Sequence, residues 1–585
     1  VGAVTLQAGA SLSVGSTGHQ DAVVTGDVTV NSKAALSGIG TIVGNINVMS
    51  GGGLLPGFAA GILNATGNVA FAPASNFLVT AIPTQASKLV VGGTATLTGG
   101  TVRVSAAGAF APSTQYNILT AAGGLSGTFN GQPAINSIFL TPSLTYDNNN
   151  VFLTLACNNP AACSDGGATG GDTGGGSAGS GTTGGGTASA GFGFATVAQT
   201  RNQAAVATAL DGGPVSNPLI IAVLNQTVAG ARQAFEALSG EVFGSVHNTQ
   251  SQEAQFARSA MLGRMRQASY AGAPGELGAL GFAGPQLAYA SADANSFPVK
   301  AAPGARGPSR DLTFWAQGLG GWGHADSDGN AASLRSRFGG FLSGVDARFG
   351  DTWRAGFVAG YMRSDLNVDA RASSAGIDSV QLGGYASGRV GAFNVRGGAS
   401  YSLDTIDTSR AIFFPGFADK ASARFHGNVG QVFGEVGYGM AFGQVAVEPL
   451  AGLAYVHVRD GSFLESGGAA ALSGASANEN TGYSFLGVRV ASAMPLANGT
   501  VLVPRGMLQW QHAFGDVTPA TALAFQGTGA AFSVAGIPIA RDTALVEGGF
   551  DWRFAPQAKL GAFYQGELAA HAQTHAVKGG FTWEF

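Results

Sequence analysis

Apolar and polar residues alternate with a period of two through about the last 275 residues of the chain. Alternation of this kind, in runs bounded by turn residues, predicts β-strands with one apolar face and one polar face. Each run is long enough for the roughly 9–11 residues with which a tilted strand crosses a bilayer. Twelve runs fit the pattern, at residues 312–322, 337–349, 353–364, 378–390, 393–405, 423–440, 445–458, 481–494, 501–513, 541–553, 559–569 and 575–585.

The polar face of these runs holds charged, amide and tyrosine side chains. In the fourth run, for example, Val380 and Leu382 flank Gln381. In a transmembrane barrel the apolar face meets lipid and the polar face lines the lumen. We therefore predict that the following residues face a lumen: Gln381, Tyr385, Arg389, Asn394, Arg396, Glu547, Asp551, Arg553, Lys559 and Glu567.

The connections between runs alternate in length. Those after the even-numbered runs are short, such as 391–392, whereas those after the first, third, fifth, seventh and ninth runs are long, up to 515–540. Outer-membrane barrels combine short periplasmic turns with long external loops, and no strand edge can stay unpaired in lipid. Residues 310–585 are thus predicted to form a closed, 12-stranded antiparallel transmembrane β-barrel.

The final run places Phe581, Trp583 and Phe585 together on its apolar face. Aromatic rings at a strand end suit a lipid–water boundary. We expect this run to close the barrel by pairing with residues 312–322.

Residues 1–156 read as short strands separated by Gly, Asn and Ser turns, and no helix is predicted there. Segments near 40–50 and 89–105 share the same texture of β-branched residues and glycine corners. Stacked rungs of short strands form a solenoid. We predict a right-handed parallel β-solenoid, with a β-sandwich as the alternative.

Residues 191–270 have helical character, with segments at 195–210, 218–227, 229–238 and 241–270. The Asp211-Gly212-Gly213-Pro214 sequence ends the first of them. Two interpretations stay open: a small helical domain packed on itself, or a segment that passes through the barrel lumen. Residues 271–309, rich in Gly, Ala and Pro, are predicted to be an irregular connection.

Residues 157–190 contain both cysteines, Cys157 and Cys163, followed by a Gly/Ser/Thr-rich flexible linker. One close pair in a polar loop favours a local disulfide of an oxidising compartment, with free thiols as the alternative.

Composition agrees with an exported β-protein. Charged residues make up 11% of the chain and glycines number 94, whereas ordinary domains have roughly 25% charged residues. No window has the roughly 18 apolar residues of a membrane helix. The net charge of −4 and the lack of a Lys/Arg cluster indicate no nucleic-acid partner. The chain starts at Val1 without Met, so we expect a partial protein that lacks its signal peptide.

Short motifs that resemble nucleotide-binding or calcium-binding sites occur in the chain, but the surrounding sequence does not support either function. Residues 318–323 match G-x-G-x-x-G but lie in a predicted strand with no helix after it. Asp326, Asp328 and Asn330 begin like a calcium loop, yet its twelfth position is Arg337. No Ser/His/Asp or Cys/His set has a supporting context. We therefore predict no cofactor, no metal and no enzymatic activity in this chain.

Specific segments resemble the classical monomeric autotransporters of bacteria (type V secretion). Residues 38–91 look like the passenger-associated repeat of pertactin-like and AIDA-like passengers, and residues 116–155 look like the autochaperone cap of their β-helix. Residues 237–242 resemble the opening of the helix between passenger and barrel, and Phe585 with Trp583 and Phe581 matches the family's assembly signal. Some relatives cut themselves at an Asn-Asn pair in the helix; residues 191–309 contain none.

The resemblance implies a monomer in the bacterial outer membrane that exports its own passenger and displays it at the cell surface or releases it. It implies as partners outer-membrane lipid, the barrel assembly machinery, periplasmic chaperones and a host or neighbouring cell surface. We expect an adhesin-like or structural passenger; the alternative is an enzymatic passenger, a hydrolase or protease, encoded upstream. A porin-like channel is disfavoured because porins have no N-terminal solenoid.

Overall fold

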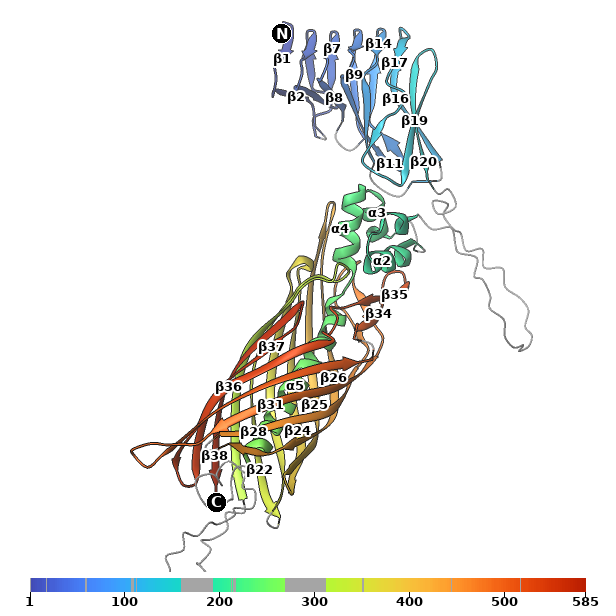
Figure 1. Ribbon diagram of the computed structural model, residues 1–585. Coiled ribbons are helices and arrows are strands. Elements are labelled where there is room, and N and C mark those ends of the chain that lie inside the picture. Colours follow the sequence, from blue (N-terminus) through green and yellow to red (C-terminus); the bar gives the residue numbers. More distant parts are fainter. Residues whose placement is uncertain are drawn as a thin grey trace, which may run out of the picture. The chain divides into compact units, whose positions relative to one another are not determined.

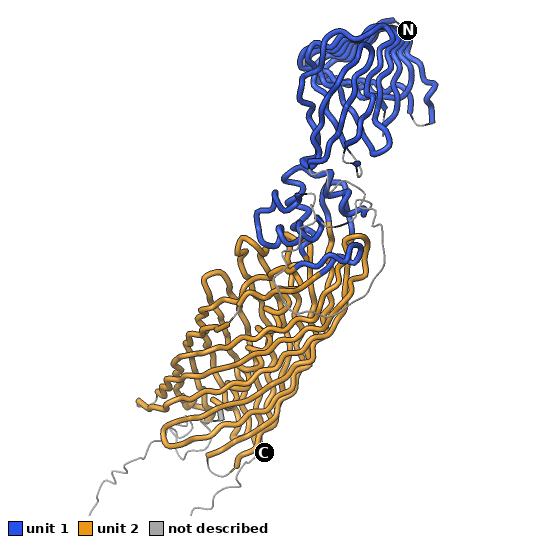
Figure 2. Tube along the Cα trace, turned by 90° about the vertical axis from the view of Figure 1, so that its right-hand side faces the viewer, with its two compact units in different colours: residues 1–239, 413–419, 524–532 blue, residues 240–412, 420–523, 533–585 orange. Residues whose placement is uncertain are grey.

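The computed structural model describes residues 2–585 except 17, 58–59, 107–109, 112, 159–192, 212, 214–216, 269–311, 350–351, 443–444 and 516. It divides into two compact units (Figure 2). The first comprises Val1–Ser239, Phe413–Asp419 and Ala524–Phe532, and the second Gly240–Ile412, Lys420–Leu523 and Ser533–Phe585. The predicted connection at 271–309 and nearly all of the predicted linker at 157–190 lie outside the described residues.

The N-terminal part of the first unit is a coil of short strands stacked in three sheets (Figure 1). In one sheet Val28, Ile46, Val69, Ala95 and Leu125 follow one another in parallel register. Parallel rungs of this kind define a β-solenoid and not an antiparallel sandwich. The first sheet contains β1 (Val4–Leu6), β4 (Val28–Val30), β7 (Ile46–Val48), β10 (Val69–Phe71), β14 (Ala95–Thr98) and β17 (Leu125–Thr128). The second contains β2 (Ser11–Val14), β5 (Ala35–Gly38), β8 (Gly53–Pro56), β11 (Asn76–Ile82), β15 (Thr101–Ala106) and β18 (Ala134–Ile135), with β12 (Gln85–Ala86) beside β11. The third contains β3 (Val23–Thr25), β6 (Thr41–Val43), β9 (Ile62–Ala65), β13 (Lys88–Val91), β16 (Ser113–Ala121), β20 (Asn150–Cys157) and β19 (Leu140–Tyr146).

The solenoid is held by an apolar interior and by a polar ladder at one corner. Phe71, Phe77 and Phe129 pack inside with ring centroids 5.1–5.5 Å apart. At the corner, the Asp27 carboxylate accepts from the Asn45 backbone N–H (2.7 Å), Asn45 Oδ1 accepts from the Asn68 N–H (2.8 Å), and Asn68 Oδ1 accepts from the Thr94 N–H (2.8 Å). Each side chain therefore satisfies the turn of the next rung. The hydrogen bonds from the backbone and side chain of Asn45 lower the pKa of Asp27.

The last rung is closed by antiparallel strands. β20 pairs antiparallel with both β16 and β19, so it covers the edge that a parallel stack would leave open. Tyr116 on β16 is buried, which raises its pKa to about 12, and its hydroxyl donates to the Ile82 carbonyl (2.7 Å).

The helical segment begins as a 3₁₀ turn, η1 (Phe194–Val197), followed by α2 (Arg201–Asp211), α3 (Pro218–Leu224), α4 (Val228–Leu238) and α5 (Val242–Ala268). The predicted helix 195–210 is thus two elements. Asn217 caps α3 by accepting from the Leu219 N–H (2.9 Å) with Pro218 at the first helical position, and Thr227 caps α4 through the Gly230 N–H (3.1 Å). Among the helices in the described ranges, none combines the length and apolar composition needed to span a bilayer.

The second unit contains a closed antiparallel barrel of twelve strands, as predicted. β21 pairs with β38 and β26 pairs with β28, which completes the ring. The strands are β21 (Leu312–Ala325), β22 (Leu334–Phe349), β23 (Trp353–Val368), β24 (Ser373–Val390), β25 (Phe393–Phe414), β26 (Phe417–Tyr438), β28 (Val445–Asp460), β31 (Ala477–Ser492), β33 (Val501–Phe514), β36 (Asp542–Ala555), β37 (Ala558–Leu568) and β38 (Ala572–Glu584). Two short strands, β27 (Met440–Phe442) and β32 (Met494–Pro495), extend neighbouring hairpins.

The sequence predicts long connections after the third and fifth strands, and this prediction is wrong because both are short. β23 and β24 continue to a short turn with η3 (Asp369–Arg371), and β25 and β26 continue to a tight turn between Phe414 and Phe417. Their inward residues stay buried and paired: Arg410, for example, bonds Glu465 at 2.8 and 2.9 Å.

The seventh and ninth connections are long, as predicted, and form a sheet of their own. Its strands are β29 (Phe463–Leu464), β30 (Leu472–Gly474), β34 (Ala520–Phe525) and β35 (Ala531–Ala535). Sequence reasoning missed these four strands.

Candidate functional site: the barrel lumen and helix α5

Helix α5 lies inside the barrel (Figure 1), and most of its 27 residues are buried. At 1.5 Å per residue it is about 40 Å long. Its buried side chains include Gln250, Glu253, Arg258 and Arg264. Apolar side chains of the helix, such as Phe256 and Met261, pack against apolar side chains of the wall. Its buried polar groups need polar partners on the wall as well. The self-packed helical domain is therefore the wrong interpretation for α5.

The first clamp on α5 is centred on Asp346 of β22. Arg264 of the helix donates two hydrogen bonds to this carboxylate, from Nε to Oδ2 at 2.6 Å and from Nη2 to Oδ1 at 2.8 Å. Arg354 of β23 contacts the same carboxylate, and the Tyr385 hydroxyl donates to it at 2.9 Å. Trp315 Nε1 in turn donates to the Tyr385 hydroxyl (2.6 Å). Bidentate Arg–carboxylate pairs fix geometry as well as charge.

The second clamp is a buried chain of arginines and glutamates. Arg266 of the helix donates from Nε to Glu435 of β26 (3.0 Å). Arg396 of β25 bridges Glu435 and Glu448 at 2.8 Å each, and Arg489 of β31 contacts Glu448. The side chains of Arg396, Glu435 and Glu448 have no exposed surface. Both clamps hold the C-terminal half of α5, at the barrel end with the short turns.

The N-terminal half of α5 is held differently, by amides and hydroxyls. Gln250 Nε2 donates to Asp404 (2.9 Å) and Asp460 (3.0 Å), while Glu253 accepts from the hydroxyls of Ser364 and Ser379. Gln252 donates to the Thr574 hydroxyl at 2.5 Å.

Arg258, between the two halves, donates to the neutral Gln431 (3.1 Å) and Gln511 (3.3 Å) and lies 5.4 Å from the centre of the Tyr483 ring. The bidentate arginine–carboxylate pairs of α5 therefore lie in its C-terminal half. At the other end, His247 lies 3.4 Å from Asp460, and Glu241, just before the helix, lies 3.2 Å from Arg371.

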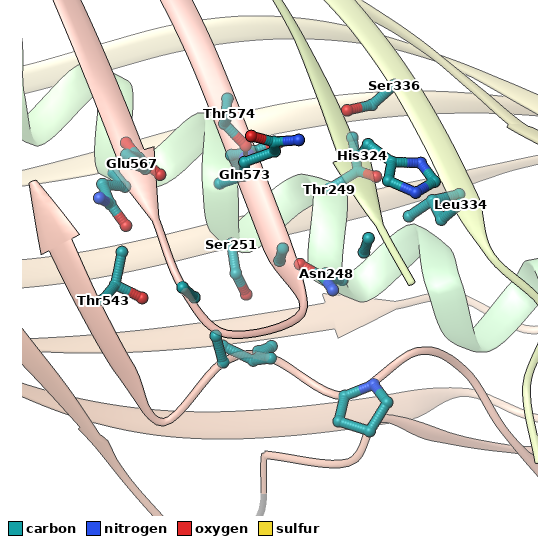
Figure 3. A pocket seen from close by; sticks show the side chains of 18 of the residues that line it. Asn248, Thr249, Ser251, His324, Leu334, Ser336, Thr543, Glu567, Gln573 and Thr574 are labelled. Carbon is teal, nitrogen blue, oxygen red and sulfur yellow. Dashed lines mark hydrogen bonds between the residues drawn. The ribbon is translucent and has the colours of Figure 1, made fainter. Parts of the chain in front are cut away.

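A polar cavity of about 90 Å³ lies beside the N-terminal half of α5 (Figure 3). Asn248, Thr249 and Ser251 line it from the helix, and Glu567 and Thr574 from the wall. With about 30 Å³ for each water molecule, it has room for a few waters and not for a polypeptide.

The ten residues predicted to face the lumen are distributed as follows. Seven are buried: Gln381, Tyr385, Asn394, Arg396, Asp551, Lys559 and Glu567. Three are half-buried: Arg389, which donates to the Gly391 carbonyl (3.1 Å), Glu547, which contacts Lys578, and Arg553.

Several of these residues meet one another or α5. Asn394 donates to Glu448 (2.8 Å), Asp551 accepts from Gln267 (3.3 Å), and Lys559 lies 3.7 Å from Glu584. Sequence reasoning missed the carboxylates Asp346, Glu435 and Glu448, although each stands on the polar face of a predicted strand.

The terminal aromatics lie on β38. Phe581 and Trp583 are half-buried with rings 6.3 Å apart, and Trp583 stands opposite Phe314 of β21. Phe585 is 63% exposed, and its N–H donates to the Leu312 carbonyl (2.9 Å). Their role as an assembly signal stays a prediction.

Cys157 is buried at the end of β20 and is disulfide-bonded. Its predicted partner, Cys163, lies outside the described residues, so the pairing stays a prediction. In the part of the chain that the structure describes, no three His, Cys, Asp or Glu residues are placed to hold a metal ion.

A closed ring of twelve strands, apolar outside and filled by a polar helix, defines an outer-membrane β-barrel. Residues 314–565 match the family model of the autotransporter beta-domain, and this part of the chain belongs to that family. The protein is thus located in the outer membrane, with its passenger exposed at the surface or secreted.

Two curated relatives, both from Serratia marcescens, are named extracellular serine protease. One is 29% identical over 588 residues, which cover 97% of this chain and 53% of the relative. The other is 32% identical over 359 residues, which cover 61% of this chain and 31% of the relative. The chain therefore spans about half of the first relative and about a third of the second.

Solved structures with a similar arrangement include two autotransporter domains. The translocator domain of NalP from Neisseria meningitidis is 19% identical, with a TM-score of 0.39, over 48% of this chain and 90% of its own. The beta domain of the Bordetella autotransporter BrkA is 18% identical, with a TM-score of 0.35, over 47% of this chain and all of its own.

The prediction that the protein is not an enzyme is contradicted by the two protease relatives. A catalytic Ser/His/Asp set is recognised by geometry in the folded protein. The order of residues along a sequence therefore carries little signal for it.

Proposed function

We propose that this protein is a serine protease autotransporter whose barrel exports a proteolytic passenger. The observation that carries the proposal is the relative named extracellular serine protease, which matches 97% of this chain. That match covers the solenoid and the helices as well as the barrel. It favours the enzymatic passenger over the adhesin-like one that the sequence led us to expect.

In this proposal the solenoid of residues 1–156 is the membrane-proximal stalk of the passenger. Residues 157–190 act as linker, 191–270 as the helical segment whose last part, α5, ends up in the lumen, and 271–309 as the connection to the barrel at 310–585. The two ionic clamps support this role for α5, because they fix its position against the wall. The lumen-facing residues supply the polar lining along which the chain moves.

Assembly partners belong to the same proposal. The barrel assembly machinery would read Phe581, Trp583 and Phe585, and periplasmic chaperones would hold the chain before insertion. The disulfide between Cys157 and Cys163 would form in the oxidising periplasm.

The test is active-site labelling of the protein secreted by cells that express the complete coding region. We expect a fluorophosphonate probe to label the passenger and to block cleavage of casein by the culture medium. Heat-denatured medium is the control for non-specific labelling. An exported passenger that neither reacts with the probe nor cleaves casein would contradict the protease proposal, and adhesion of the same cells to surfaces would then favour the adhesin.

A further inference from the structure

Four outward-facing side chains form a patch where the first and last strands of the barrel pair. The patch lies toward the barrel end that carries the long connections. The four side chains are Tyr564 on β37, His575 on β38, Trp322 on β21 and Arg337 on β22, and we call them the seam patch. Register places His575 opposite Trp322, and Trp322 opposite Arg337. Directly opposed side chains on an antiparallel pair lie within reach of each other.

Ring contacts join three of these residues. The Trp322 and His575 rings are 5.7 Å apart between centroids, and the Tyr564 and His575 rings 6.1 Å. The Tyr564 hydroxyl lies 2.6 Å from His575 Nδ1, which leaves Nε2 of the imidazole unengaged by this contact. Trp322 is 54% exposed. The patch therefore presents flat rings beside an imidazole.

Arg337 supplies a cation at the edge of these rings. It is exposed, and no carboxylate among the described residues makes an ion pair with it. Asp365, opposite Arg337 on β23, lies 3.3 Å from Arg363 instead. The guanidinium is thus open to an external anion.

The patch stands where the apolar band ends. Toward the short-turn end, the outward positions are Val577 on β38 and, after Gly339, Phe341 on β22, 57% and 54% exposed. Toward the other end they are the exposed, polar Gln573 and Arg335. Such a boundary, at the extracellular side of an outer-membrane barrel, meets lipid headgroups.

We propose that the seam patch binds the phosphorylated sugar headgroup of a glycolipid in the outer leaflet. A guanidinium matches phosphate oxygens with paired donors. His575 Nε2, which the Tyr564 contact does not engage, adds a hydrogen-bond donor for a phosphate oxygen. The aromatic rings offer apolar faces to the C–H groups of a sugar ring. The inference rests on the outer-membrane location and is independent of the proposed protease activity.

A second cluster, near the end of β33 that leads into a long connection, provides a contrast. Trp510 and His512 on β33 both hydrogen-bond Asp542, at 3.0 and 2.8 Å. Ring and imidazole are present as in the seam patch, but both contact a carboxylate, whose negative charge repels phosphate. This cluster is the matched control.

The experiment uses the full chain in phosphatidylcholine nanodiscs that contain a few mole per cent of a bisphosphorylated disaccharide lipid (lipid A). Native mass spectrometry counts the bound glycolipid, and a titration gives its affinity. We expect Arg337→Gln and Trp322→Ala each to weaken binding about tenfold, as expected for the loss of about 1.4 kcal/mol. His512→Gln should leave it unchanged, and dephosphorylated glycolipid should bind weakly to every form.

Heat-dependent migration on gels confirms that each variant is folded. Arg337→Gln alone decides the matter if Trp322→Ala does not fold, because Arg337 is an exposed side chain. Unchanged affinity in Arg337→Gln, or equal affinity for the dephosphorylated lipid, would overturn phosphate recognition. Equal affinity for phosphatidylglycerol would overturn recognition of the sugar.

Discussion

Glu448 shows how much a single buried charge can matter in this barrel. It accepts from Asn394 and Arg396 at 2.8 Å each and contacts Arg489, and its side chain is fully buried. A buried ion pair adds little net stability over an apolar pair of the same shape, but removing one partner leaves an uncompensated charge. Substitution of Glu448 should therefore cost more free energy of unfolding than the net stabilisation that its ion pairs contribute in the intact protein.

We expect Glu448→Gln to destabilise the barrel by about 3–5 kcal/mol, because Arg396 and Arg489 lose their shared carboxylate. The temperature at which the barrel loses its compact migration on gels should fall. Asp407→Asn is the matched control, since Asp407 pairs with Arg424 on the exposed surface at 2.6 Å, where screening makes such pairs weak. Equal shifts in both variants would contradict the buried-clamp account.

Phe585 gives a second prediction at this scale. Its ring is exposed and its backbone already pairs with Leu312, so Phe585→Ala removes little packing. We nevertheless expect the variant to reach the outer membrane at several-fold lower levels, because the ring is proposed to be read during assembly. Fractionation and immunoblotting of the barrel measure this, with Phe554→Ala as an aromatic control at the same barrel end. Normal levels of the Phe585 variant would refute the assembly signal.

The side of the strand on which a residue lies could be predicted from the sequence, but the residues with which it forms ion pairs could not. Period two places Arg396 and Glu547 on the polar side of their strands. Arg396 meets Glu435 and Glu448 only because three strands align in a particular register and curve into a ring. Alternation forbids a register shift of one residue, which would turn every side chain to the other face, but it does not exclude a shift of two.

Among the elements, α5 closes the pore while the two clamps hold it. We expect deletion of Val242–Ala268 to raise single-channel conductance several-fold in planar bilayers, because the polar lumen would then be filled by water. Deletion of α2, which makes none of the lumen contacts, is the control. Unchanged conductance without α5 would mean that α5 does not obstruct the lumen.

The asparagine ladder of the solenoid can be tested by removing one rung. Asn68→Ala takes the acceptor away from the Thr94 N–H and hydroxyl (2.8 and 3.1 Å), at a cost of about 0.5–1.5 kcal/mol for a hydrogen bond. Amide exchange at Thr94 should accelerate. Asn31→Ala, which loses only a 3.3 Å side-chain contact with Gln7, should leave exchange at Thr94 unchanged.

Helices and strands differ in how far sequence defines their ends. The predicted segments 218–227 and 229–238 agree with α3 and α4 to within a few residues, and the structure shows that Asn217 and Thr227 cap these helices. The strands β23–β26 run past their predicted ends because inward side chains outside the apolar band find partners, as Arg410 does with Glu465. Such tertiary partners override local signals, and the same applies to the four-stranded sheet in the long connections.

At the scale of the whole molecule, the outer-membrane location predicts that protease added outside the cell reaches the solenoid but not the barrel. Proteinase K added to intact cells should degrade residues 1–158 and leave the barrel intact. Permeabilised cells should lose a periplasmic reporter protein as well, which controls for envelope integrity. A solenoid that stays protected while the barrel is inserted would contradict surface display.

The order of domains could be predicted because solenoid, helix and barrel have distinct periodicities. The passenger activity could not, since the catalytic geometry of a protease is a property of a fold. Similarity across 97% of the chain, not any motif in it, corrected that expectation.

The unequal anchoring of α5 has a mechanical consequence. Any pull on the chain outside the cell reaches the helix first at Val242, far from its arginine clamps. Load would first meet the pair of Glu241 with Arg371, then the separate contacts of His247, Gln250, Gln252 and Glu253, and last the bidentate pair of Arg264 with Asp346. Under force, α5 would therefore detach from the barrel wall in small steps. The strongest resistance would come from its C-terminal half, at the barrel end with the short turns.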